Sequence, residues 1–152
     1  DWTLSRGLGD VYKRQDDCPY IDEAQVRYTS QDLVNGDVLP EFRGGVLSIA
    51  AGPLSVSDDL KVGEHNSNAI DNDGKNVEIS GVLSGSGGSM SFVGNGVTTL
   101  SAKNTYSGAT SVLDGVLRAG VDQAFSERSS TYIHSGATLD LNGFDHKISG
   151  VF

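Results

Sequence analysis

The sequence contains one fourteen-residue pattern twice, and this long repeat constrains the fold more than any other feature. Residues 70–83 and 139–152 align without a gap, Ile70 on Leu139, with six identities. Gly74 aligns with Gly143, for example. A fixed period of this kind is typical of repeat architectures. We therefore expect Gly74 and Gly143 to occupy the same corner of a winding chain, stacked in line along a common axis.

Beyond Gly45 the chain consists of short runs that alternate apolar and polar residues and are broken by Gly, Asn and Asp. Alternation with a period of two indicates strands with one buried face. In residues 137–141, Leu139 and Leu141 share one face and Asp140 takes the other. The runs that predict strands are Val46–Ala50, Leu54–Ser57, Asn76–Val82, Ser89–Val93, Val97–Ala102, Ala109–Leu113, Gly115–Ala119, Tyr132–His134, Ala137–Leu141 and His146–Phe152.

The period selects one all-β architecture. Only in a solenoid does each coil stack on a near-copy of itself, and the offset of about 69 residues corresponds to three coils of roughly 20–25 residues. The hydrophobic content of 37% is low for a thick core, and the 20 glycines suit many tight corners. We predict an all-β, right-handed parallel β-helix. In its first copy of the repeat Asn72 takes the inward place of Leu141, and stacked asparagines would satisfy such a buried amide.

Three segments divide the chain. Residues 1–15 resemble translated adaptor sequence and are set aside, including the Lys13-Arg14 pair. Residues 16–44 form an irregular lead-in or an incomplete coil, in which Ala24–Thr29 alternates like an early strand. Residues 45–152 form the repeats. Only Val121–Arg128 could form a turn or two of helix, and its composition fits an excursion between strands equally well.

The charge and the single cysteine limit the classes of function. The net charge is −9 without any basic patch, which disfavours nucleic acid as a partner. Cys18 has no second cysteine with which to form a disulfide. No apolar run is long enough for a membrane span, and the first twenty residues do not form a signal peptide, so an exported chain would carry its signal upstream.

Residues 95–120 carry several motifs in a fixed order. They are Thr99-Leu100-Ser101, Asn104-Thr105-Tyr106-Ser107-Gly108, Thr110-Ser111-Val112 and Gly115-Val116-Leu117. This order resembles the autotransporter-associated β-strand repeat, and the resemblance extends over about residues 68–152. Two departures are Ala109, where Gly is usual, and Val121–Arg128, which carries more charge than the typical linker.

The resemblance implies a structural, non-enzymatic stalk in the secreted passenger of a Gram-negative type V autotransporter. Such a segment supports export and folding, and adhesion where the passenger binds a host-cell or matrix ligand. It is displayed at the cell surface, and its partner is the outer-membrane β-barrel translocator of the same polypeptide. The absence of disulfides suits a chain that is threaded unfolded through a pore and then folds coil by coil.

Side chains that could carry chemistry form no recognisable site, and we predict no catalytic, metal-binding or cofactor-binding residue. His65, His134 and His146 lack the spacing of a metal site, which indicates surface or strand-packing positions. The run Gly85-Ser86-Gly87-Gly88-Ser89 lacks the dinucleotide-binding pattern and predicts a coil corner. Asp71-Asn72-Asp73-Gly74 lacks the Gly and Glu of an EF-hand loop and predicts a turn.

The alternative is a carbohydrate-active β-helix, a polysaccharide lyase or hydrolase, suggested by the aspartates Asp71, Asp73 and Asp140. Catalysis of this kind needs two carboxylates within roughly 5–10 Å. On equivalent strands three coils apart, Asp71 and Asp140 would lie roughly 14–15 Å from each other. The neighbouring Asp58 and Asp59 would point to opposite faces of an extended strand. A non-enzymatic stalk is therefore the primary hypothesis.

Overall fold

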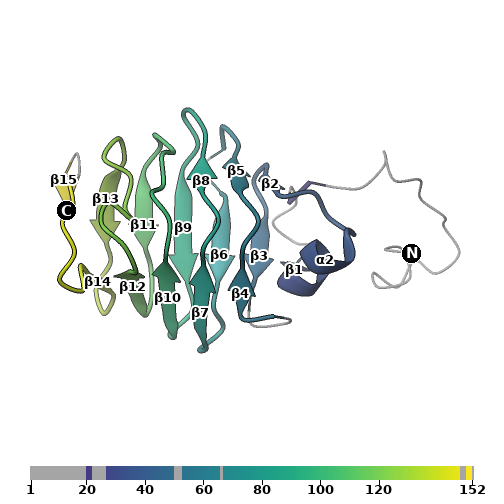
Figure 1. Cartoon of the computed structure of the whole chain (residues 1–152), viewed down its shortest axis with the longest axis horizontal. Coiled ribbons are helices and arrows are strands. Elements are labelled where there is room, and N and C mark those ends of the chain that lie inside the picture. The colour runs from purple at the N-terminus through teal and green to yellow at the C-terminus, as the bar shows by residue number, and fades with distance from the viewer. Residues whose placement is uncertain (1–19, 22–26, 50–52, 66, 148–149, 152) are drawn as a thin grey trace, which may run out of the picture.

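The computed structural model describes residues 20–21, 27–49, 53–65, 67–147 and 150–151, most of which lie in short strands and turns (Figure 1). The adaptor-like residues 1–15 and Cys18 fall outside the described residues. Across the described ranges, no helix is both long and apolar enough to cross a membrane.

The strands form three parallel sheets, which the chain visits in rotation. The seven-stranded sheet has the order β1 (Arg27–Thr29), β3 (Val46–Ser48), β6 (Ala69–Asp71), β9 (Met90–Val93), β11 (Thr110–Val112), β13 (Ser130–Ile133) and β15 (Gly150–Val151). The five-stranded sheet has the order β14 (Thr138–Asp140), β12 (Val116–Ala119), β10 (Val97–Leu100), β7 (Asn76–Ile79) and β4 (Ser55–Val56). The three-stranded sheet contains β2 (Glu41–Phe42), β5 (Leu60–Val62) and β8 (Leu83–Ser84).

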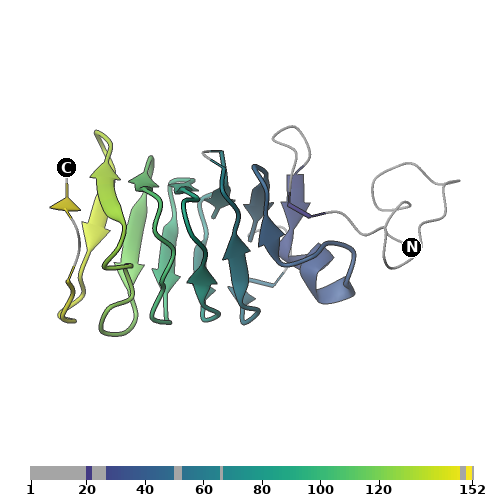
Figure 2. The same cartoon turned by 90° about the horizontal axis from the view of Figure 1, so that it is seen from above.

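Every pair of neighbouring strands in these sheets is parallel. The strands stack as a β-solenoid of about six turns, and its coils stand side by side along one axis (Figure 2). The predicted parallel β-helix is therefore confirmed. The sheets also reach back before residue 45, because β1 pairs with β3 and β2 pairs with β5.

The register shows that the coils are of similar length. Leu47, Ile70, Phe92, Val112 and Ile133 pair in succession along the seven-stranded sheet. Their spacing along the chain is roughly 20–23 residues, at the lower end of solenoid repeat lengths and as expected. All but Ile133 are at most 2% exposed, and Ile133 packs against the same core. The stacked side chains form a narrow column of apolar residues. Burying each aliphatic or aromatic side chain of this size stabilises the fold by roughly 1.5–3 kcal/mol.

The ten expected runs all contain strands, mostly with shorter bounds, and four further strands lie outside every predicted run. These are β2, β5, β6 and β8. All four contain only two or three residues, too few for alternation to be recognised in the sequence, and in β6 all three residues are buried. The early strand expected over residues 24–29 is β1, although residues 24–26 lie outside the described ranges.

The register of the long repeat was predicted wrongly. Gly74 follows β6 of the seven-stranded sheet, whereas Gly143 follows β14 of the five-stranded sheet, so the two glycines lie at different corners. Leu139 stacks over Leu117, which continues the column of Thr98 and Val77. The residue stacked three coils below Leu139 is thus Val77 and not Ile70. The offset of the repeat is longer than three coils, so the second copy of the pattern lies on the next sheet. The stacking of coils does not depend on that offset.

The two copies of the repeat form the same kind of turn, although they lie at different corners of the coil. In each copy an aspartate Oδ1 accepts a hydrogen bond from the backbone N–H two residues later, Asp73 N in one case and Asn142 N in the other, at 2.8 and 2.9 Å. Each then places two residues at positive φ, with 48° and 82° at Asp73-Gly74 and 53° and 78° at Asn142-Gly143. Asp and Asn tolerate this conformation, and Gly adopts it freely. The repeated letters therefore encode a repeated turn.

The first coil contains a short helix, α2 (Ser30–Asn35), that the sequence analysis did not predict. Thr29 and Asp32 form a reciprocal capping box, and Gly36 closes the helix at φ 76°. The chain reaches α2 after β1 and continues to β2, so the helix occupies the place of a strand in the five-stranded sheet. It lies beside the edge strand β4, with which it lines a pocket of about 180 Å³. Val121–Arg128, by contrast, forms turns between strands.

Candidate functional site: acidic turns, buried asparagines and a polar groove

Two aspartates of the carbohydrate hypothesis, Asp71 and Asp140, have structural roles and do not share a site, while Asp73 is exposed on the turn after β6. Asp71 lies in β6 and is only 8% exposed, and Asp140 lies in β14 of a different sheet. The expectation that they project outward from equivalent strands is wrong, because it rested on the predicted register of the long repeat. Both carboxylates hold the turns described above. They offer no pair for joint acid and base catalysis.

Asp140 also forms an ion pair on the outer face of the five-stranded sheet. Its Oδ2 accepts a hydrogen bond from Arg118 Nε at 2.8 Å, from the neighbouring coil. The Arg118 hydrogen bond, followed by that from Asn142 N–H, lowers the pKa of Asp140. Both side chains remain partly exposed, so the pair contributes little to stability.

The neighbouring carboxylates Asp58 and Asp59 lie on the exposed turn between β4 and β5. Asp59 Oδ1 accepts a hydrogen bond from the backbone N–H of Val82, one coil further on, at 2.8 Å. This carboxylate therefore joins two coils at their corner. That contact gives Asp59 a structural role.

The histidines occupy the surface and packing positions that the sequence predicted. His65 and His134 are exposed, and the half-buried His146 stacks on Phe125 with ring centroids 4.8 Å apart. Among the residues that the structure describes, no three His, Cys, Asp or Glu side chains converge on a common point where a metal ion could bind.

Glycines stack at the corner between the three-stranded and seven-stranded sheets, where the run of residues 85–89 lies as predicted. A Cβ on Gly88 would lie well under 3.0 Å from the carbonyl oxygen of Gly63, and one on Gly108 would lie equally close to that of Gly88. Gly63, Gly88 and Gly108 thus form a column in which each coil approaches the last too closely for any side chain.

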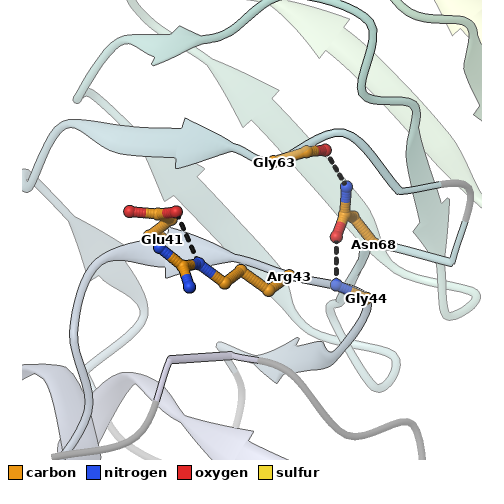
Figure 3. A network of polar contacts seen from close by, with 5 residues as sticks. All are labelled: Glu41, Arg43, Gly44, Gly63 and Asn68. Carbon is orange, nitrogen blue, oxygen red and sulfur yellow. Dashed lines mark hydrogen bonds and ion pairs between the residues drawn. The ribbon is translucent and has the colours of Figure 1, made fainter.

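Buried asparagines bridge successive coils, and the sequence analysis missed two of the three. Asn68 is fully buried, and its Oδ1 accepts a hydrogen bond from Gly44 N–H at 2.6 Å while its Nδ2 donates to Gly63 O at 3.0 Å (Figure 3). Nδ2 also lies 3.0 Å from Ser89 O. An amide has both a donor and an acceptor, so it can extend the hydrogen bonding of the backbone between coils. The ion pair between Arg43 Nε and Glu41 Oε2, which are 2.7 Å apart, lies beside this contact.

The other two buried asparagines, Asn104 and Asn72, play similar parts. Asn104 Oδ1 accepts from Leu83 N–H at 2.8 Å, and its Nδ2 donates to Ala124 O at 2.7 Å, so one amide connects three coils. Asn72 is buried as expected, but its Nδ2 donates to Thr98 Oγ1 at 3.1 Å and not to a stacked asparagine. The partners of Asn72 were therefore predicted wrongly.

Tyr106 is the largest fully buried side chain of the core. Its hydroxyl contacts the Thr110 hydroxyl, which in turn lies 2.7 Å from Ser129 Oγ. Burial raises the pKa of Tyr106 to about 12, against a smaller opposing effect of these hydroxyls. Ser126 Oγ donates to Tyr106 O at 2.6 Å from the next coil. This tyrosine belongs to the turn motif of the family resemblance.

A polar groove of about 660 Å³ opens where the three-stranded sheet ends. Its lining comes from residues 85–86, 103–105, 123 and 126–128, which belong to three successive coils. The sequence analysis assigned no role to these side chains. The only signal was the unusual charge of Val121–Arg128, which departs from the family pattern at the place where the groove forms. The volume of the groove lies in the range of small-ligand sites, roughly 300–1,000 Å³.

A comparison with curated proteins finds a relative that has the expected character. The chain is 37% identical over 117 residues, 76% of its length, to the Adhesin BmaC autotransporter of Brucella suis biovar 1 (strain 1330). The resemblance to an autotransporter passenger is confirmed. The chain spans about 3% of the length of that autotransporter adhesin. No protein-family model matches the chain, and no solved structure matches it.

Proposed function

We propose that this chain is a structural segment of a surface-displayed autotransporter passenger, whose coils extend a rod and support export, folding and adhesion. The observation that carries the proposal is the parallel β-solenoid in a chain similar to an autotransporter adhesin. The partner would be the translocator of the same polypeptide, and the location the cell surface. A host-cell or matrix ligand would bind the passenger there.

The way in which the coils are joined supports this role. Each coil forms its hydrogen bonds with the coil before it, so a chain emerging from a pore could add one coil at a time. Buried amides such as Asn104 connect each coil to its neighbours within the same short stretch of sequence. Folding of this kind needs no distant segment to be present.

A display experiment tests the proposal. The whole chain is placed between a secretion signal and the translocator of a well-characterised autotransporter, and its exposure is measured by antibody labelling and protease digestion of intact bacteria. We expect labelling equal to that of the native passenger. Retention of the chain in the periplasm, while the native passenger reaches the surface through the same translocator, would refute the export role.

The carbohydrate-active alternative loses the carboxylate pair that it needs, since Asp71 is buried at the end of β6 and Asp140 lies on another sheet. It is tested by incubating the chain with acidic plant and bacterial polysaccharides. Appearance of reducing ends or unsaturated products would restore the enzyme hypothesis and contradict a purely structural role.

A further inference from the structure

We propose that the polar groove lined by residues 85–86, 103–105, 123 and 126–128 binds a carboxylated saccharide, a role that goes beyond that of a stalk. Two cationic side chains, Lys103 and Arg128, line this groove together. Both are exposed. Within the part of the chain that the structure describes, neither side chain forms an ion pair or a hydrogen bond. They are therefore available to an external anion.

The charge of the surroundings defines the ligand more closely. The chain has a net charge of −9, and Glu127 lines the same groove. A polyanion would be repelled by this background, whereas a ligand with one carboxylate is attracted locally by the two cations. The planar guanidinium of Arg128 matches a carboxylate in geometry, and the Lys103 ammonium adds a point charge. One carboxylate on an otherwise neutral molecule fits best.

The size and the remaining lining indicate a sugar. A volume of about 660 Å³ lies in the range of small-molecule sites, roughly 300–1,000 Å³, and suits a short oligosaccharide. The hydroxyl-bearing residues Ser86 and Thr105 are exposed at the lining. Such groups exchange hydrogen bonds with sugar hydroxyls.

The walls of the groove are held in place before any ligand binds. Asn104 is fixed by its bonds to the coils on either side. Gln123 donates from Nε2 to Lys147 O at 2.7 Å and accepts from Lys147 N–H at 2.8 Å. Ser126 is anchored to Tyr106 O. A preorganised site loses less conformational entropy on binding, which favours a weak ligand such as a sugar.

Calorimetric titration of the whole folded chain with sialyllactose tests the proposal. The matched ligands are lactose, which lacks the acidic sugar, and the methyl ester of sialyllactose, which lacks only the charge. The variants are Lys103→Gln and Arg128→Gln, with Lys75→Gln as a control because Lys75 is also exposed and does not line the groove. Far-UV circular dichroism establishes that each variant is folded, and these surface changes leave the core intact.

We expect sialyllactose to bind, with affinity reduced at least about fivefold by either groove substitution and by esterification, since hydrogen bonds to charged groups are the stronger ones. Lys75→Gln should leave the affinity unchanged. The proposal is overturned if the folded chain binds no sialyllactose, if lactose binds as well as sialyllactose, or if Lys75→Gln weakens binding as much as Lys103→Gln. The measurement is made in solution and does not depend on surface display.

Discussion

The glycine column predicts that a single methyl group at Gly108 will weaken the solenoid. A Cβ at this position would lie well under 3.0 Å from the carbonyl oxygen of Gly88, a backbone atom that cannot rotate away. The corner would have to open by more than a side-chain adjustment. Two bonds cross this corner: Met90 N–H donates to Ala109 O at 2.9 Å, and Ala109 N–H donates to Ser89 Oγ at 3.2 Å.

The expected magnitude follows from these contacts. Overpacking a rigid site costs typically about 1–3 kcal/mol, and each weakened hydrogen bond adds about 1 kcal/mol. We therefore expect Gly108→Ala to lower the free energy of unfolding by about 3 kcal/mol. That is a large share of the roughly 5–15 kcal/mol that stabilises an ordinary domain.

A second glycine separates crowding from backbone conformation. Gly136 has a φ of 87° and no atom within 4 Å of a built Cβ, so Gly136→Ala suffers only the conformational penalty of about 1–2 kcal/mol. Both variants are compared with the unaltered chain by urea denaturation followed by circular dichroism. If Gly108→Ala is no less stable than Gly136→Ala, the close stacking of coils at this corner is refuted.

Three further substitutions test other contacts. Asn68→Ala leaves Gly44 N–H without its acceptor in the core and removes the amide donor to Gly63 O, which still accepts from His65 N–H. We expect it to lower the unfolding free energy by about 2–3 kcal/mol in urea denaturation. The exposed Asn95→Ala is its control, and equal effects would contradict the bridging role. Because the pKa of Tyr106 is raised to about 12, its stabilising effect is complete below the unfolded value near 10 and is lost as the pH rises through about 12. In Tyr106→Phe the unfolding free energy should therefore fall less steeply with pH in this alkaline range. An unchanged slope would count against burial of the hydroxyl. The lowered pKa of Asp140 means that its stabilising effect is present above the unfolded value of about 3.9 and is lost as the pH falls through the lower folded value. Asp140→Asn should therefore lower stability at pH 7, only slightly because the ion pair is partly exposed, and should reduce the decline of stability in acid, which pH-dependent thermal melting would detect or disprove.

The architecture could be predicted from the sequence because its signals are local. Alternation in runs such as residues 97–102 reports a half-buried strand, and Gly, Asn and Asp report the turns between runs. The approximate length of a coil, roughly 20–25 residues, was expected from the repeat lengths of solenoids in general. The strands that were missed are those in which the signal is too short, such as β8, or in which both faces are covered, such as β6.

The stacking register of the two repeat copies could not be predicted because their similar sequences form the same local turn at different corners. Asp71 and Asp140 each hold a turn at the end of a strand, and such a turn is useful at any corner of the coil. An alignment of the two copies therefore matched turns on different sheets. The helix α2 was missed for a related reason: Gly36 closes the helix but also fits the Asn-Gly-Asp turn signal.

The position of the groove follows from a change in how coils are joined. On the side of the three-stranded sheet, strand pairing among the described residues stops after β8. Single backbone hydrogen bonds, such as that from Thr105 N–H to Leu83 O, still join the coils there, and side chains add further bridges. Asn104 supplies an acceptor to one coil and a donor to the next, as a peptide group would, and Gln123 makes the same pair of bonds to Lys147. A ladder places strands at a fixed spacing of about 4.8 Å, whereas a side-chain bridge allows the backbone to turn outward between anchor points. The excursion at residues 121–128 uses that freedom. In such a solenoid two sheets continue from coil to coil while the third side accommodates a ligand-sized groove, so a rod of repeated coils can acquire binding without altering its core.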